Sequence, residues 1–136
     1  MPTHEREAKA RRRLVLIVDD SPVDLDVSRR RLEQAGYDCL LREMPLGTAA
    51  IVLRERPDAV LMDVGLPGLN GDQIASLLRK NDGTPCPIVI LHSGLPVSAL
   101  EQLARECGAI GFIQKTGDNE LFISQFNRLF MRGVGS

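Results

Sequence analysis

Short runs of apolar residues alternate along the chain with longer segments in which apolar and polar residues are mixed. An apolar run without a polar break, such as LVLIV at 14–18, is typical of a strand that is buried on both faces of a parallel sheet. Five segments have the length and apolar character of strands. They are Leu14 to Val18, Tyr37 to Leu41, Ala59 to Asp63, Pro87 to Leu91 and Ala109 to Ile113.

The mixed segments that follow these strands predict helices. Pro22 suits the first turn of a helix, where its missing N–H group has no intrahelical partner to lose. Gly36 and Gly108 end two of the helices, and either Asp118 or Asn119 can cap the last one. The five predicted helices span residues 22–35, 46–54, 72–80, 96–107 and 119–130.

The alternation of strands and helices predicts an α/β fold. Parallel strands need crossover connections, so the helices are expected to cover both faces of one parallel sheet. A chain of 136 residues has the length of a single domain with one substantial core. We expect a mobile charged leader over residues 1–13, the domain over 14–130 and a C-terminal tail over 131–136.

Composition and charge exclude several classes of protein. A net charge of −1 gives no general attraction to nucleic acid or to a membrane surface. No apolar run approaches the roughly 18 residues of a membrane span, and the N-terminus lacks the apolar segment of a signal peptide, so a cytoplasmic location is predicted. Three cysteines, Cys39, Cys86 and Cys107, lack the spacing of a metal site and are predicted to be free thiols.

Polar side chains stand where four of the predicted strands end. Asp19 and Asp20 follow the first strand, Asp63 ends the third, Ser93 follows the fourth and Lys115 follows the fifth. The carboxyl ends of parallel strands lie along one edge, where ligands of open α/β sheets bind, so these side chains are expected to converge. Clustered carboxylates repel one another unless a cation lies between them, and such oxygen donors suit Mg²⁺. By itself, Asp63 is equally typical of a residue that only ends a strand and begins a turn.

This set of residues suits phosphoryl chemistry. Beside a bound metal ion, Asp63 can act as an oxygen nucleophile toward phosphorus, and Ser93 and Lys115 can contact the phosphoryl oxygens. The pair Asp19-Asp20, the aspartate in LMDVGLPGLNG, the serine after the fourth strand and the lysine in GFIQK resemble the receiver domain of bacterial two-component response regulators. The resemblance covers nearly the whole chain.

The resemblance implies a doubly wound (βα)5 flavodoxin-like fold, a three-layer sandwich with a five-stranded parallel sheet in order 2-1-3-4-5. It implies that Asp63 takes a phosphoryl group from a phosphohistidine on a sensor histidine kinase or a histidine phosphotransfer protein. Mg²⁺ would be held directly by Asp20 and Asp63, largely through water by Asp19, and by the backbone carbonyl of Gly65. Beyond its own phosphorylation and dephosphorylation, such a domain is not an enzyme.

The resemblance also implies a conformational switch. Ser93 would move toward the phosphoryl group, Phe112 would rotate inward behind it, and Lys115 would contact a phosphoryl oxygen. These movements would change the surface formed by the last two predicted helices and the strand between them. A downstream output protein or a second copy of the chain would bind that surface, and neither nucleic acid nor a membrane is expected as a direct partner.

Two residues depart from the family pattern. Thr116 follows Lys115, where the family usually has a proline in a cis peptide. A cis bond before threonine costs roughly 3 to 4 kcal/mol, so we expect a trans bond and a displaced loop. Phe112 lacks the hydroxyl group of a tyrosine, so its switching would depend on packing alone.

Two other functions stay open at this point. One is a receiver-fold interaction module that acts independently of phosphorylation, which Thr116 favours and the retained acidic residues oppose. The other is an Mg²⁺-dependent phosphatase with an aspartate nucleophile, but that chemistry needs a second acid two residues later, where this chain has Gly65. The sequence leaves open the kinase, the output partner, the oligomeric state, the phosphoryl lifetime and whether the domain acts alone or within a longer protein.

Overall fold

The computed structural model describes residues 12–65 and 87–135, which form five strands and four helices. The strands make one parallel sheet in the order β2-β1-β3-β4-β5. They are β1 (Leu14–Val18), β2 (Asp38–Arg42), β3 (Ala59–Asp63), β4 (Ile88–Ser93) and β5 (Gly111–Gln114). The helices are α2 (Pro22–Gln34), α3 (Thr48–Glu55), α5 (Val97–Cys107) and α6 (Asn119–Val134). The α/β fold and the strand order 2-1-3-4-5 are confirmed.

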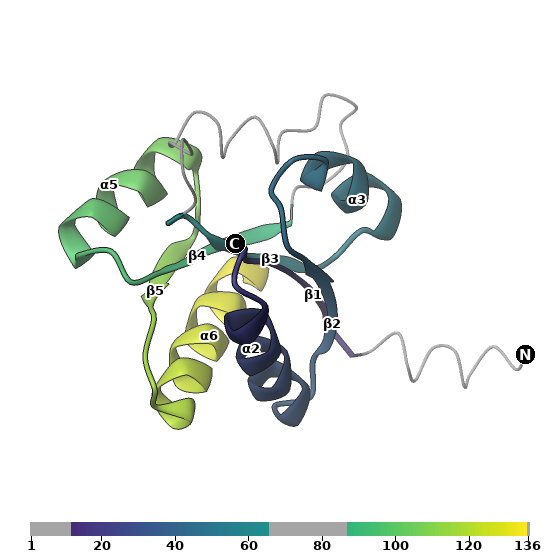
Figure 1. The fold of residues 1–136 in the computed structure, drawn as a ribbon, viewed down its shortest axis with the longest axis horizontal. Coiled ribbons are helices and arrows are strands. Elements are labelled where there is room, and N and C mark those ends of the chain that lie inside the picture. Colours follow the sequence, from purple (N-terminus) through teal and green to yellow (C-terminus); the bar gives the residue numbers. More distant parts are fainter. Residues whose placement is uncertain (1–11, 66–86, 136) are drawn as a thin grey trace, which may run out of the picture.

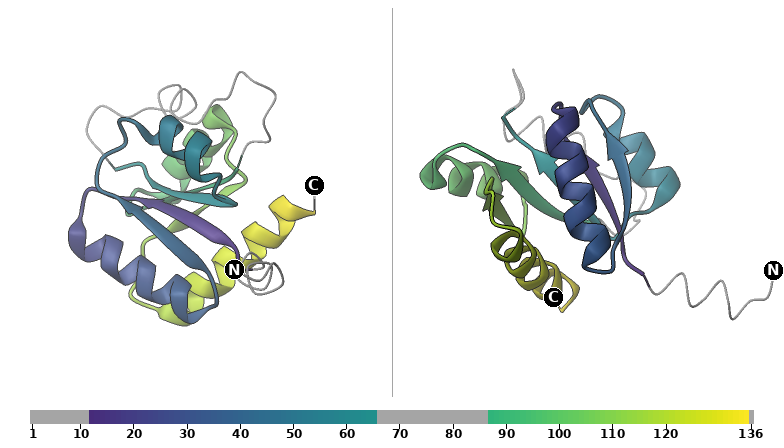
Figure 2. Two further views of the ribbon diagram at one scale, coloured as in Figure 1. Left: turned by 90° about the vertical axis from the view of Figure 1, so that its right-hand side faces the viewer. Right: turned by 60° about the horizontal axis from the view of Figure 1, so that its bottom comes forward.

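Helices cover both faces of the sheet and produce three layers. Helices α2 and α6 lie side by side on one face, while α3 and α5 cover the other (Figure 1). The two further views in Figure 2 show the same division. The crossover connections explain this arrangement, because a right-handed strand–helix–strand unit places its helix on a face that depends on the direction in which the sheet grows.

Each layer of helices has its own hydrophobic core. Side chains alternate between the faces of a strand, so Val15 and Ile17 of β1 face α2 and α6, whereas Leu16 and Val18 face α3 and α5. Both faces are buried, which is why β1 needs an unbroken apolar run. The core under α2 and α6 is rich in aromatic rings, contributed by Tyr37, Phe122, Phe126 and Phe130.

The residues at the helix ends show which of the predicted caps and boundaries the structure uses. Ser21 caps α2, accepting a hydrogen bond from the amide of Asp24 at 3.2 Å, with Pro22 in the first turn as predicted. Of the two candidate caps for α6, Asp118 is the one used, because its side chain accepts a hydrogen bond from the amide of Leu121 at 3.0 Å. The predicted start of α3 at residue 46 is wrong by two residues, since Gly47 has a left-handed conformation with φ 87° and the helix begins after it.

Other boundaries differ by small amounts. Strand β5 begins at Gly111 rather than Ala109, because the amide of Ala109 is still bonded to the carbonyl of Ala104 at the end of α5. Helix α6 continues to Val134, four residues beyond the predicted end. The helix predicted over 72–80 lies outside the described residues.

The segment before β1 is partly described. Arg12 donates a hydrogen bond to the carbonyl of Tyr37 at 3.1 Å and forms an ion pair with Asp38 at 2.8 Å. Arg13 lies over the ring of Phe130, 5.8 Å from its centroid. These contacts join the start of β1 to β2 and α6.

Cys39 and Cys107 are free, half-buried thiols, as predicted, and Cys86 lies outside the described residues. Burial raises the pKa of the Cys39 thiol to about 12 and also raises the pKa of Cys107, which keeps both thiols protonated. Among the helices that the structure describes, none is long and apolar enough to cross a membrane.

The aromatic core generates a stability prediction. Phe126 is fully buried and lies between the rings of Phe122 and Phe130, with Tyr37 at its edge. Phe126→Ala should lower the free energy of unfolding by about 3 to 5 kcal/mol, because the ring leaves a cavity that the sheet cannot fill. Urea denaturation followed by circular dichroism measures this loss.

The matched control is Leu121→Ala, in the first turns of the same helix, where the side chain is 45% exposed. We expect this change to alter the free energy of unfolding by less than about 0.5 kcal/mol. Equal losses from the two variants would contradict the assignment of Phe126 to the core.

Candidate functional site

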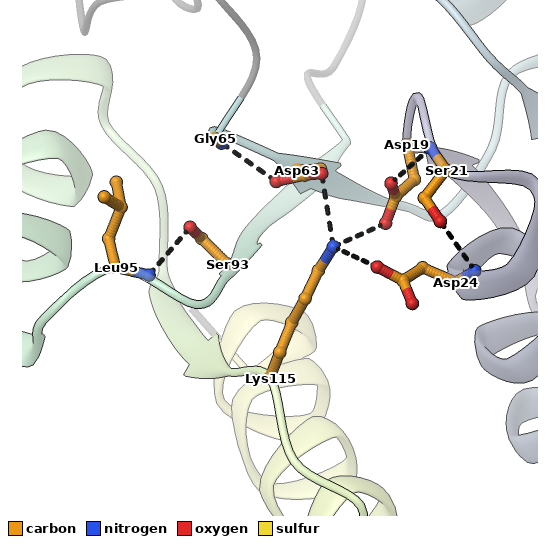
Figure 3. A network of polar contacts seen from close by, with 8 residues as sticks. All are labelled: Asp19, Ser21, Asp24, Asp63, Gly65, Ser93, Leu95 and Lys115. Carbon is orange, nitrogen blue, oxygen red and sulfur yellow. Dashed lines mark hydrogen bonds and ion pairs between the residues drawn. The ribbon is translucent and has the colours of Figure 1, made fainter.

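Four of the predicted site residues meet at the carboxyl edge of the sheet. Asp19 follows β1, Asp63 ends β3, Ser93 ends β4 and Lys115 follows β5. The strands end within one residue of the same level, since Asp63 pairs with His92 and Ser93 with Gln114. Figure 3 shows Lys115 extending toward the carboxylates of Asp63, Asp19 and Asp24. The expected convergence of the strand ends is therefore observed.

Three carboxylates form a cluster at this edge. One oxygen from each of Asp19, Asp20 and Asp63 lies within 4.8 Å of the others. Asp19 and Asp63 are buried, whereas Asp20 is exposed and leaves one side of the cluster open to solvent. Carboxylate oxygens with room for water are the donors that Mg²⁺ takes, so the residues present fit the metal ion that the resemblance implied.

Asp63 is held in place by two contacts from different directions. Its Oδ1 accepts a hydrogen bond from the amide of Gly65 at 2.9 Å, and its Oδ2 lies 3.2 Å from Lys115 Nζ. The Gly65 position has little spare room, since a Cβ atom there would stand 3.3 Å from Asp63 Oδ1 and 3.7 Å from Ser93 Oγ. The carbonyl of Gly65 as a metal ligand stays a prediction.

Lys115 is the centre of charge neutralisation. Its Nζ lies 2.7 Å from Asp24 Oδ2, 3.0 Å from Asp19 Oδ2 and 3.2 Å from Asp63 Oδ2, which uses all three donors of the ammonium group. Burial alone lowers the pKa of Lys115, but the hydrogen bonds to Asp24 and Asp19 outweigh it and raise that pKa. The group is therefore a permanent cation at neutral pH.

The peptide bond after Lys115 is trans, as predicted, since no cis bond occurs in the described part of the chain. The lysine nevertheless reaches Asp63. Its backbone amide donates to the carbonyl of Ser93 at 2.8 Å, which ties the start of the loop to β4.

The burial of the clustered carboxylates and the repulsion among them are evident in the pKa of Asp19. Burial raises the pKa of Asp19 to about 6, and neighbouring Asp63 acts in the same direction. The amide of Ser21, 3.0 Å from Asp19 Oδ1, and the ammonium of Lys115 partly offset this rise. Two buried carboxylates at adjacent strand ends thus need more positive charge than one lysine supplies, which favours cation binding.

Ser93 and Phe112 occupy different places relative to this cluster. Ser93 is buried, and its Oγ accepts a hydrogen bond from the amide of Leu95 at 3.1 Å, which leaves the hydroxyl proton available to another acceptor. Phe112 is half-buried and packs against the core under α3 and α5. Their roles in a switch stay predictions.

Asp24 belongs to the site, although it was not among the predicted site residues. It is the third residue of α2, and its carboxylate is the closest of the three to Lys115. A usable signal was present: Ser21 predicts that α2 begins at the site edge, and acidic residues are favoured in the first helical turn.

His92 is a second residue that the sequence analysis did not assign to the site. It pairs with Asp63 in the sheet, is 4% exposed and lies edge-on to Phe122, with ring centroids 5.3 Å apart. Its Nε2 has no hydrogen-bond partner among the residues that the structure describes. Burial lowers the pKa of His92 to about 4, and the charge of Lys115 acts in the same direction.

The fold and this edge define a flavodoxin-like α/β domain with an acidic site at the carboxyl ends of its strands. The family model described as the response regulator receiver domain matches residues 15–127. Protein PilH of Pseudomonas aeruginosa is 33% identical over 113 residues, which cover 83% of this chain and 93% of PilH. The chain therefore belongs to the response regulator receiver domain family.

Other similarities agree with this assignment. The phosphate regulon transcriptional regulatory protein PhoB of Pseudomonas aeruginosa is 35% identical over 103 residues, but this chain spans only 44% of its length. The chemotaxis response regulator CheY4 of Vibrio cholerae has the same fold, with a TM-score of 0.75 and 20% identity over 87% of this chain and 98% of that one.

A further solved structure is the receiver domain of a sensor histidine kinase from Pseudomonas aeruginosa, which carries a magnesium ion in its active-site cleft. It has a TM-score of 0.74 and 23% identity, and the match covers 92% of this chain and 99% of that one. At this identity the likeness shows a common fold. The sequence relatives and the family match show that this chain is a receiver domain of two-component systems.

The buried histidine generates a prediction about pH. The folded-state pKa of about 4 is below the ordinary value of 6.5, so between these values the unfolded chain binds more protons and stability falls as pH falls. His92→Leu should remove this dependence. Between pH 7 and pH 5 the wild type should lose up to about 2 kcal/mol more than the variant.

Urea denaturation at the two pH values measures this difference. The raised pKa of Asp19 acts in the opposite direction, but Asp19 is present in both proteins and cancels in the comparison. Identical pH dependence in the two proteins would show that His92 does not stay neutral in the fold.

Proposed function

We propose that this receiver domain takes a phosphoryl group from a phosphohistidine onto Asp63, with Mg²⁺ held by Asp19, Asp20, Asp63 and the carbonyl of Gly65. The observation that supports it most directly is the setting of Asp63. Its carboxylate is buried beside two other acids, and one oxygen lies 3.2 Å from Lys115 Nζ. This setting supports the proposed roles of Asp63 as the nucleophile, of the three carboxylates as metal-binding donors and of Lys115 as the cation for the incoming phosphoryl oxygens.

In the proposed reaction, an oxygen of Asp63 forms a bond to phosphorus as the bond from phosphorus to the donor imidazole nitrogen breaks. The electron pair of that bond stays on the imidazole. The hydrogen bond from Gly65 and the contact with Lys115 hold the carboxylate in one orientation, which lowers the entropic cost of the attack. The chemistry that bound Mg²⁺ supplies is neutralisation of charge on the carboxylates and the phosphoryl oxygens.

The proposed response of the domain begins at Ser93. A phosphoryl oxygen on Asp63 would compete for its hydroxyl group and weaken the hydrogen bond that Oγ accepts from Leu95. The carbonyl of Leu95 also accepts a hydrogen bond from Gln114 Nε2 at 2.9 Å, and the Leu95 side chain packs in the same core as Phe112. Movement of Leu95 would therefore change its contacts with α5 and β5.

This route supports the face of α5, β5 and α6 as the signalling surface, where a downstream output protein or a second copy of the chain would bind. The phosphoryl donor would be a sensor histidine kinase or a histidine phosphotransfer protein, and the cytoplasmic location predicted from the sequence is part of the proposal. The similarity to PhoB, a transcriptional regulatory protein, supports an output partner without naming it.

The proposal is tested by intact mass after incubation with acetyl phosphate and Mg²⁺. Wild type should gain one phosphoryl group, and Asp63→Asn should gain none, because the amide is a poor nucleophile while the packing is retained. Omission of Mg²⁺ should also prevent the gain. Glu101→Gln, an exposed change on α5, should behave as wild type.

Uptake by Asp63→Asn at the wild-type rate would remove Asp63 from this role. If wild type gains no phosphoryl group, a beryllofluoride titration is decisive. Binding of beryllofluoride would indicate a phosphorylated form that hydrolyses quickly, and absence of binding would support the phosphorylation-independent interaction module.

The contact between Asp24 and Lys115 generates a second prediction. Asp24 competes with the phosphoryl group for the ammonium, so Asp24→Asn should speed phosphoryl uptake. The ion pair is partly exposed, with the Asp24 side chain 41% accessible, and contributes about 0.2 to 1 kcal/mol, which corresponds to an increase of about 1.4-fold to fivefold. Time-resolved intact mass measures the rate.

Asp26→Asn is the matched control, since Asp26 lies on the same helix and pairs with Arg29 and Arg30 away from Lys115. Its uptake rate should equal that of wild type. Slower uptake by Asp24→Asn would show instead that Asp24 aligns the lysine for the reaction.

A further inference from the structure

The loop that follows Lys115 lies against α2 through one side chain. Arg31 Nη2 donates a hydrogen bond to the carbonyl of Thr116 at 2.9 Å, and its Nε donates to Asn119 Oδ1 at 2.6 Å. The first acceptor, Thr116, lies in the loop of residues 115–118 directly after Lys115. The second, Asn119, is the first residue of α6, where the loop ends. A single guanidinium group therefore bonds to both ends of the loop.

Arg31 is unusual in its burial. The residue is 8% exposed, and its guanidinium lies over the ring of Phe122, 5.2 Å from the centroid. Both hydrogen-bond partners that it has within the described chain are neutral. Burying a charged group without a carboxylate partner is costly, and the two acceptors of the loop, together with the ring of Phe122, offset part of that cost.

Lys115 lines a cavity of about 50 Å³ that lies between α2, β4 and the loop, so its side chain is not fully enclosed on this side. Arg31 and Thr116 line the same cavity, together with Val27, Ser28 and His92. The amide of Lys115 is bonded to β4 through the carbonyl of Ser93, which holds the residue on its N-terminal side. On its C-terminal side the bond to α2 comes from Arg31.

We propose that Arg31 is a positioning residue for Lys115, which acts by holding the carbonyl of Thr116 and the side chain of Asn119 so that the ammonium stays within reach of Asp63 and its phosphoryl group. The inference rests on the proposed function, because it concerns the same reaction. It adds a residue of α2 that touches neither the metal-binding carboxylates nor the phosphoryl group. The planar fork of arginine suits this task, since its donors point in fixed directions toward two acceptors.

The test uses Arg31→Met in the full chain, which keeps a long side chain but removes both hydrogen bonds. The rate of phosphoryl uptake from acetyl phosphate should fall about tenfold, because the lysine is no longer held in its reactive position. The affinity for Mg²⁺, measured from the Mg²⁺-dependent rise in melting temperature, should stay unchanged, since the metal-binding residues follow β1 and β3.

Matched variants separate positioning from general destabilisation. Arg30→Met changes the neighbouring arginine, whose side chain is 68% exposed, and should leave the uptake rate as in wild type. Arg31→Lys keeps one donor group and should give an intermediate rate. In a Lys115→Ala background, Arg31→Met should cause no further loss, whereas a structural effect would slow both backgrounds equally.

Each outcome has a distinct meaning. If wild type takes up no phosphoryl group and binds no beryllofluoride, the proposed function fails, and this inference with it. If wild type is active and Arg31→Met has the same rate, or loses Mg²⁺ affinity by the same factor, only the positioning role of Arg31 is overturned. If Arg31→Met does not fold, Asn119→Ala and Arg31→Lys carry the same comparison, because each removes part of the contact.

Discussion

Two carboxylates lie buried where adjacent strands end, and their repulsion is the constraint on which the arrangement of this edge depends. Asp19 follows β1 and Asp63 ends the neighbouring strand β3, so the pairing of the two strands holds these buried carboxylates near each other. In this structure Lys115 bonds to both of them. A bound divalent cation would replace part of that role, so the same electrostatic need links metal binding, the lysine and the proposed phosphoacceptor role of Asp63.

The elements around the site hold these charged groups in place. Helix α2 contributes Asp24 to the ammonium and Arg31 to the loop behind it. Gly65 holds one oxygen of Asp63 through its amide. Ser93 stands on the other side, bonded to Leu95 at the approach to α5. In the proposed function, a phosphoryl group on Asp63 would act on α5 and α6 through these polar contacts.

The predictable part of the site follows from strand geometry. Asp19, Asp63, Ser93 and Lys115 were predicted together because each stands where an apolar run ends, and parallel strands end along one edge. The contributions of α2 were missed for a physical reason. The helical period indicates which side of a helix is polar, but it does not indicate what lies opposite that side. Asp24 and Arg31 fell within a mixed segment that predicted only a helix, yet Asp24 bonds to Lys115 and Arg31 is buried.

The sequence by itself determined the α/β alternation, the buried central strands and the residues at the strand ends, because these depend on local periodicity and chain direction. The strand order came from the resemblance to a family. Only the tertiary structure decided that Asp118 rather than Asn119 caps α6, that His92 is enclosed beside Phe122, and that Arg31 bonds to the loop after Lys115. The last two features bring together groups from distant parts of the chain, whose contacts depend on how α2 and α6 pack against one sheet.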